Sequence, residues 1–248
     1  MMLPAIRGVI DRRMLVNFRV DPAVLATLLP APFRPKVFAA HGVAGICLIR
    51  LRAIRPVGLP AWLGVGSENA AHRIAVEWTA ADGDVREGVY IPRRDTTSRL
   101  NAAFGGRLFP GIHHHARFEV SETAERFALS MRSDDGTAHL SVVTRLAADL
   151  PRGSIFGSVA EASRFFEGGS LGYSPTAVPA TYQGLELRCE GWRVEPLAVE
   201  QVASSFFDDR ARFPTGSATF DCALLMRGIE HEWHQHRDMC CAPAVTAA

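Results

Sequence analysis

Short segments in which apolar and polar residues alternate recur along this chain of 248 residues, with turn signals between them. Residues 13–20 alternate and then meet Asp21-Pro22, a helix-start signal, and residues 43–52 form an apolar strand pattern. Asp82-Gly83 joins two further strand patterns as a hairpin. Strands that bury one face alternate in this way, so the pattern favours an antiparallel sheet over a parallel, doubly wound one.

The remaining segments extend this pattern. We predict, in chain order, a helix over 98–106, a hairpin of 126–132 with 138–146, a helix after a capping box of Ser158 and Glu161, a loop over 168–173, a strand over 185–194, a helix over 199–207 and a strand over 218–233. The predicted fold is mainly β (α+β), an antiparallel β-barrel or cone with a few short peripheral helices. We expect a single domain over 1–248, with its core at about 10–235 and a mobile tail over 236–248.

The charge balance excludes several partners. With 27 basic and 26 acidic residues, the chain has no excess charge that would attract nucleic acid or an anionic membrane surface. No segment has the roughly 18 consecutive apolar residues that cross a bilayer. The five cysteines show no paired spacing, which is typical of a protein in a reducing compartment and predicts a cytoplasmic location.

The segment 108–120, LFPGIHHHARFEV, concentrates groups that titrate near neutral pH directly after a turn. On a strand, His113, His115 and Arg117 point to one face, and His114 points to the other. Either these side chains line a solvated face, or one face lines a cavity where a histidine binds a carboxylate or moves a proton. A metal site on His113 and His115 is the rival, but a histidine pair alone is not a zinc site, and we predict no metal and no cofactor.

Other residues could contribute to a site. Glu68 follows a glycine-rich turn at a strand start, Tyr90 could form a hydrogen-bonding wall, and Arg50 could hold an anion. Each of them also has an ordinary structural interpretation. The sequence contains no nucleophile elbow, phosphate-binding loop or dinucleotide fingerprint, so it gives no support to a hydrolase, kinase or dehydrogenase.

Three segments together resemble the acetoacetate decarboxylase-like superfamily, in particular its YqjF-like branch: MLVNFRVDPAVLATLLPAPFRP, GSENAAHRIAVEW and YIPRRDTTSRLNAAFGGRLFPGIHHHARFEV. The resemblance implies a cone-shaped antiparallel barrel with a central apolar cavity, often in a homo-oligomer. It also implies a site with an aromatic-Pro-Lys-Lys motif, whose lysine forms a Schiff base, and a pocket glutamate similar to Glu68. Here Phe109-Pro110 matches the motif, but Gly111-Ile112 replaces its lysines.

The only lysine, Lys36, lies in a different, proline-rich loop, and arginine cannot form an imine. We therefore expect a protein that binds a small organic acid or carbonyl compound without Schiff-base chemistry. If it is an enzyme, it would be a lyase or isomerase with histidine and glutamate as acid and base. The predicted catalytic residues are His113, His115 and Glu68, and the predicted ligand-binding residues are Tyr90, His114, Arg50, Arg117, Phe109 and Gly111. The alternatives are a noncatalytic sensing or assembly module and a metal-dependent lyase or cyclase.

Overall fold

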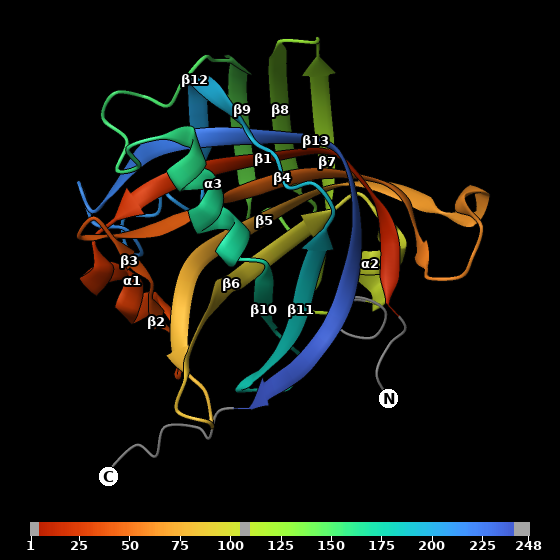
Figure 1. Ribbon diagram of the computed structural model, residues 1–248, viewed down its shortest axis with the longest axis horizontal. Helices are drawn as coiled ribbons and strands as arrows, with labels where there is room; N and C mark the ends of the chain where they lie inside the picture. The colour runs from red at the N-terminus through yellow and green to blue at the C-terminus, as the bar shows by residue number, and fades with distance from the viewer. Residues whose placement is uncertain (1–4, 105–109, 241–248) are drawn as a thin grey trace.

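The computed structural model describes residues 5–104 and 110–240 and consists mainly of strands (Figure 1). Thirteen strands form one mixed sheet: β1 (Ile6–Val20), β2 (Arg34–Pro35), β3 (Val37–Phe38), β4 (His41–Pro56), β5 (Val65–Thr79), β6 (Val85–Thr96), β7 (His113–Glu122), β8 (Arg126–Ser133), β9 (His139–Leu146), β10 (Leu171–Pro175), β11 (Thr181–Cys189), β12 (Glu195–Ser204) and β13 (Ala218–Cys240). The helices are α1 (Pro22–Leu28), α2 (Arg99–Phe104), α3 (Val159–Gly168) and the single 3-10 turn η1 (Ala61–Leu63). The prediction of a mainly β fold with short helices is confirmed.

The sheet closes on itself twice. Strands β13, β1, β4, β5 and β6 form a shared wall, and all pairings within it are antiparallel. The two outer strands of the wall are β6 and β13, and one edge of each is divided between two further strands that pair with different parts of it. β6 pairs with β10 and β7, and β13 pairs with β11 and β12. The chain β7-β8-β9-β12 completes what we call the larger ring, and β10-β11 completes the smaller ring. Both pairings at the divided edge of β6 are parallel, so the sheet is mostly but not entirely antiparallel.

Side chains alternate along each wall strand, so that one set points into the larger ring and the other set points into the smaller ring. Met14 and Val16 of β1 pack with Ile46 of β4 and Ile74 of β5 in the apolar interior of the larger ring. Their neighbours on the opposite face, such as Leu15 and Cys47, belong to a second cluster instead. The smaller ring therefore encloses the other set of alternating residues of the wall strands, to which Leu15 and Cys47 belong. The candidate site is built from that set.

Helix α3 lies across the wall on the side of the smaller ring (Figure 1). Half of the capping box predicted at its start is present: the Ser158 hydroxyl accepts a hydrogen bond from the Glu161 amide at 3.2 Å, but the Glu161 carboxylate accepts from the amide of Gly157 instead of Ser158. Phe165 and Phe166 on its buried face pack against β1 and β4. The helix thus covers one end of the smaller ring, and the residues after it, Gly169 and Ser170, reach the interior of that ring.

Four predicted elements differ from the structure. The strand predicted over 185–194 is instead β11, Thr181–Cys189, and residues 190–194 lie outside any strand. Residues 199–207 do not form a helix, because β12 occupies Glu195–Ser204 and pairs with β9. The register shifts between Val199 and Gln201, and this irregularity breaks the period-two pattern and produces helix-like spacing. Within the predicted loop 168–173, a strand begins at Leu171. Residues 236–240, assigned to a tail, continue β13 and pair with β11.

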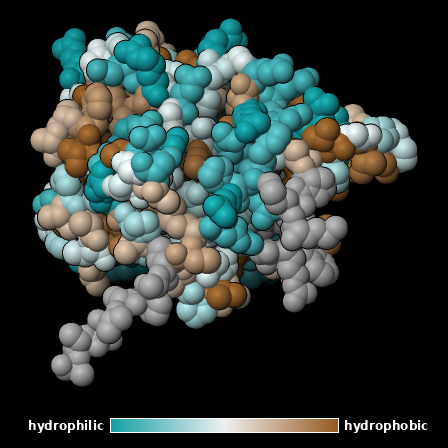
Figure 2. Space-filling view, turned by 60° about the horizontal axis from the view of Figure 1, so that its bottom comes forward, coloured by the Kyte–Doolittle hydropathy of each residue, from teal (hydrophilic) through white to brown (hydrophobic). Residues whose placement is uncertain are grey.

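The connection between β4 and β5 projects from the body as an arm that carries η1 (Figure 1). Exposed apolar side chains gather on it, including Trp62, which is 80% exposed, and Figure 2 shows hydrophobic surface at its end. In the part of the chain that the structure describes, no helix has the length and apolar character needed to span a bilayer. The expectation of a homo-oligomer stays a prediction.

Candidate functional site

A cavity of about 140 Å³ lies within the smaller ring. All seven strands of that ring contribute to its lining, which includes Arg13, Cys47, Asn69, Arg73, Val89, Ile91, Arg94, Gly172, Leu185, Leu187 and Trp233. Pro110, His113 and Asn101 also line it. At roughly 10–15 Å³ for each water-sized group, the cavity has room for on the order of ten non-hydrogen atoms, which is the size of a small metabolite.

Three arginines converge in this cavity on Cys47. In the sheet register, Cys47 of β4 pairs with Ala71 of β5, and Ala71 pairs with Arg94 of β6. Arg73 lies two residues beyond Ala71 on β5, and Arg13 lies two residues from the partner of Cys47 on β1. The Arg13 Nε atom donates a hydrogen bond to Cys47 Sγ at 3.3 Å. The side chains therefore reach the same region from three strands.

These arginines have no carboxylate partner within the described residues. Arg73 donates to Asn17 Oδ1 at 2.5 Å, its guanidinium lies 4.8 Å from the Phe166 ring centre, and its Nε is buried without a partner. Arg94 donates to Ser174 Oγ at 2.9 Å. Burial lowers the pKa of Arg73 and of Arg94 to about 10, which leaves both guanidinium groups charged at pH 7. The cavity wall is thus positively charged.

Asp95 is a carboxylate that lines the cavity, but it is already paired with Arg93, which is not one of these three arginines. Asp95 is fully buried and accepts hydrogen bonds from Arg93 Nε at 2.9 Å and from a terminal nitrogen of Arg93 at 2.8 Å. This two-bond contact balances the charge of Asp95. The excess positive charge of the cavity therefore remains on Arg13, Arg73 and Arg94.

Of the three consecutive histidines, only His113 lines this cavity. Burial, with a further contribution from the charge of Arg94, lowers the pKa of His113 to about 4, so the imidazole is neutral at pH 7. The His113 Nδ1 atom lies 3.1 Å from the carbonyl oxygen of Gly111, so Nδ1 donates to that oxygen. The structure thus places a neutral imidazole beside the arginines.

The other two histidines contact the turn between β8 and β9. The Nδ1 atoms of His114 and His115 lie 2.8 and 2.7 Å from Asp135 and Asp134, respectively. Arg117 is 84% exposed and lies 3.4 Å from Asp134. None of these side chains lines the cavity.

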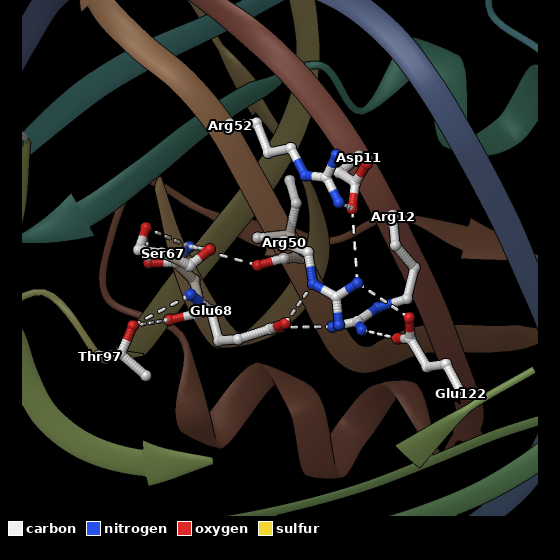
Figure 3. A network of polar contacts seen from close by, with 10 residues as sticks. Asp11, Arg12, Arg50, Arg52, Ser67, Glu68, Thr97 and Glu122 are labelled. Atoms are coloured by element: carbon white, nitrogen blue, oxygen red, sulfur yellow. Dashed lines mark hydrogen bonds and ion pairs between the residues drawn. The ribbon is translucent and has the colours of Figure 1, made fainter. Parts of the chain in front are cut away.

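Glu68 and Arg50 also lie outside the cavity, in a closed ion-pair network (Figure 3). Glu68 accepts hydrogen bonds from Arg50 Nε at 2.6 Å and from Arg12 at 2.5 Å. Glu122 of β7 pairs with both arginines. Burial lowers the pKa of Arg12, and the charge of Glu68 opposes that shift. Glu68 alternates with Ser67 and Asn69, which do line the cavity, so it belongs to the opposite face of β5.

The last predicted ligand-binding residues lie in different places. Tyr90 packs in the larger ring, 5.7 Å from the Phe33 ring centre, and burial raises the pKa of its hydroxyl to about 12. Gly111 has φ +85°, and its amide donates to Gln183 Oε1 at 3.0 Å. Phe109 and the predicted helix end at 105–106 lie outside the described residues, as does the chain beyond Cys240.

Neither a lysine nor a metal cluster appears in the cavity. Lys36 is the only lysine of the sequence, and its Nζ lies 2.6 Å from Glu87, away from the cavity lining. Within residues 5–104 and 110–240, no group of three or more His, Cys, Asp or Glu side chains could hold a metal ion. In the histidine-rich part of β13, His234 instead pairs with Glu232 at 3.0 Å.

Sequence reasoning missed Arg13, Arg73, Arg94 and Cys47. A partial signal exists, since Arg13 and Arg73 each interrupt an otherwise apolar strand pattern. An arginine at such a position must find a partner when its strand is buried. The three arginines are brought together by the pairing register of β1, β4, β5 and β6, which the pattern of any one strand does not contain.

Solved structures with the same fold are acetoacetate decarboxylase-like proteins. An acetoacetate decarboxylase-like enzyme from Sphingomonas wittichii RW1 superposes with a TM-score of 0.58 at 11% identity, covering 96% of this chain and 93% of that one. The enduracididine biosynthesis enzyme MppR complexed with pyruvate gives 0.57 at 12% identity, covering 97% and 91%. Acetoacetate decarboxylase from Legionella pneumophila gives 0.57 at 10% identity, covering 99% and 90%. At these identities the likeness shows the fold alone.

The fold is therefore that of the acetoacetate decarboxylase-like superfamily, as the sequence resemblance predicts. Within it, the chain belongs to the DUF2071 family of uncharacterized conserved proteins, whose model matches residues 10–216. No curated protein matches the sequence.

Proposed function

We propose that this protein binds a small organic acid, with a 2-oxo acid as the best candidate, in the cavity of the smaller ring. The observation that carries the proposal is the presence of Arg13, Arg73 and Arg94 in one cavity without a carboxylate partner in the described chain. A buried cation without a counter-charge is unfavourable, and a ligand carboxylate would supply that charge. The cavity volume of about 140 Å³ restricts the acid to a small one.

The proposal gives the binding role to these arginines and an acid–base role to His113. A neutral imidazole can accept a proton next to a carbonyl group, and an arginine can stabilise the oxyanion that develops there. No lysine is available in the cavity, so the reaction would proceed without an imine. The pyruvate bound in the MppR structure supports the choice of a 2-oxo acid.

Glu68, Arg50 and His115 receive a structural role in this proposal, because their charges are matched by neighbouring side chains. Tyr90, with its place in the aromatic interior, receives the same role.

A binding protein without turnover is the second candidate. The observation that favours it is the low pKa of His113, about 4, since an efficient general base has a pKa nearer to the working pH. Turnover assays on the acids that bind would separate the two functions. Release of a product or exchange of the α-proton in deuterated water supports an enzyme, and binding without either supports a sensor or carrier.

The binding proposal can be tested by thermal shift and calorimetry with pyruvate, 2-oxobutyrate, acetoacetate and the neutral analogue pyruvamide. We expect stabilisation by the acids but not by the amide, and a loss of about tenfold or more in affinity in Arg73→Gln and Arg94→Gln. Arg117→Gln removes the same charge from the surface and is the matched control. An equal response to pyruvate and pyruvamide, or no response to any acid, would contradict the proposal.

A further inference from the structure

Among the described residues, Cys47 is the one cysteine that lines the cavity, and it shares that lining with Arg13, Arg73 and Arg94. Cys47 lines the cavity and is 8% exposed, and its sulfur accepts the Nε–H of Arg13 at 3.3 Å. Arg73 and Arg94 reach the same region from β5 and β6. The Arg13 guanidinium therefore holds the Cys47 sulfur at the cavity wall, within reach of a ligand bound there.

A second feature points independently to an anionic ligand at this place. Arg73 is only 5% exposed and lines the cavity, and its Nε is buried without a hydrogen-bond partner. Arg12 Nε also lacks a partner, but Arg12 has two carboxylates beside it, whereas Arg73 combines an unused donor with a charge that no carboxylate balances in the described residues. A carboxylate bound there would lie in the same cavity lining as Cys47 and Arg13.

We propose that Cys47 is a nucleophile that adds reversibly to the carbonyl carbon of a bound 2-oxo acid. The inference rests on the proposed function, since it uses the same cavity and the same class of ligand. In a 2-oxo acid the electrophilic carbon is bonded directly to the carboxylate. A carboxylate held by Arg13 or Arg73 therefore brings that carbon close to Sγ, which already lies 3.3 Å from Arg13 Nε.

The addition is balanced without any further reactant. The sulfur of Cys47 forms a bond to carbon 2 of the acid, and the carbon–oxygen π pair moves onto the carbonyl oxygen. The proton that the thiol loses ends on that oxygen, and the product is a hemithioketal. No group leaves and nothing is oxidised or reduced, so the reverse step returns the thiol and the acid. The cysteine thus offers a covalent attachment in a cavity that contains no lysine.

The other described cysteines differ from Cys47 in position and burial. Cys222 is fully buried, and burial raises the pKa of its thiol to about 12. Burial also raises the pKa of Cys189. Neither residue lines the cavity. Cys240 is exposed at the end of β13 and provides an internal reference for a thiol in water.

Charge-selective alkylation tests the inference on the full chain. Iodoacetate carries its electrophilic carbon directly on a carboxylate, as a 2-oxo acid does, whereas iodoacetamide is the neutral analogue of similar size. Peptide mass mapping would give the ratio of the two alkylation rates at each cysteine. We expect the iodoacetate-to-iodoacetamide ratio at Cys47 to exceed that at Cys240 by about tenfold or more. The excess should fall in Arg13→Gln, persist in Arg117→Gln and disappear when pyruvate fills the cavity. Equal ratios at Cys47 and Cys240 would overturn the inference.

Carbon-13 NMR of the protein with [2-¹³C]pyruvate then tests the bond itself. We expect a new protein-bound resonance in the region of a tetrahedral carbon attached to sulfur and oxygen, absent from Cys47→Ala and from Cys47→Ser. Thermal unfolding of the two variants would verify that they fold. If pyruvate stabilises the wild type and both variants equally and no such resonance appears, the inference fails while the proposed function stands. If no acid stabilises the wild type, the proposed function itself fails.

Discussion

Two clusters of arginine lie on opposite faces of the same wall of the sheet, and they differ in how their charge is balanced. Arg12 and Arg50 pair with Glu68 and Glu122, so every charge in that cluster has a partner (Figure 3). Arg13, the residue next to Arg12, faces the cavity of the smaller ring and has no carboxylate in the described residues. One step along a strand thus separates a structural arginine from one that is available to a ligand.

The same contrast recurs on β6. Arg93 holds Asp95 and Asp135, whereas its neighbour Arg94 faces the cavity with Ser174 as its hydrogen-bond acceptor. The comparison teaches that the residue type alone does not mark a site. A closed set of charges balances itself within the protein, whereas an open set of like charges in a cavity is what the proposed function pairs with an acid of the opposite sign.

The largest effect is expected where the closed cluster is broken. Glu68→Ala removes one of the two carboxylates that Arg12 and Arg50 share, and should lower the free energy of unfolding by about 3 kcal/mol because both guanidinium groups, with Arg12 only 2% exposed, are left to share Glu122. Urea denaturation would measure the change. Arg52→Gln breaks an exposed pair with Asp11 and is the control, with a loss of about 0.5 kcal/mol or less. A loss below about 1 kcal/mol in Glu68→Ala would show that the cluster is not essential to the wall.

Lowering the pH toward 5 should destabilise the protein, because His113 stays neutral in the cavity while the unfolded chain binds the proton. The pKa of His113 is about 4 in the folded protein and 6.5 when exposed, so the unfolded chain binds more protons between these values. Its contribution to stability is complete above pH 6.5 and falls by about 1.4 kcal/mol per pH unit below it, about 2 kcal/mol by pH 5.

Urea denaturation from pH 8 to 5 would compare the wild type with His113→Gln. His72 and His231 have pKa values lowered in the same direction, and both remain in the variant, so the difference in slope reports His113 alone. Parallel curves below pH 6.5 would contradict the buried, neutral state of His113.

A matched pair of substitutions sharpens the contrast between the two clusters. Arg73→Met removes a buried charge that has no counter-ion, so the ligand-free protein should keep its stability or gain about 1 kcal/mol. The affinity for pyruvate should fall about tenfold or more, as measured by calorimetry. Arg12→Met, the same change in the closed cluster, should instead destabilise the protein and leave the arginines of the cavity in place. Equal destabilisation by both variants would contradict the distinction between a cluster with carboxylate partners and a cluster without them.

The smallest effects are expected on the outer surface of β7. His115→Gln and Arg117→Gln remove partners of Asp134, which is itself substantially exposed. Each should change the free energy of unfolding by about 0.5 kcal/mol or less. Neither should alter the affinity for a small acid, and a clear loss of binding in His115→Gln would return that residue to the site.

The sequence predicted the fold where each strand signals its own structure. The alternation in residues 13–20 and the turn at Asp82-Gly83 depend on neighbours in the chain, and both predictions agree with the structure. The strand β10 was missed because Gly172 lies where an added Cβ would approach Ile91 Cδ1 to 2.9 Å. Its glycine serves the close parallel pairing with β6, although glycines in a sequence usually indicate a loop.

Part of the cavity lining lies in the segment that the sequence singled out, while the role of these residues in a site stays a prediction. Reading 108–120 as one side of a cavity agrees with the positions of Pro110 and His113 in the lining. The sequence could not distinguish Glu68, whose partners Arg12 and Glu122 come from β1 and β7, from a free pocket acid. It also could not bring Arg13, Arg73 and Arg94 together, because the strands that carry them meet only through the register of the wall.

The conformation of Gly111 limits how the lysine-dependent chemistry of related proteins could be introduced here. Its φ of +85° disfavours any other residue, and a Cβ at this position would lie 2.5 Å from the Cβ of Ser174. Gly111→Lys would therefore meet both backbone strain and a collision. The segment of β10 near Ser174 would have to move before a lysine could be accepted at position 111, so this substitution alone would not place an amine there.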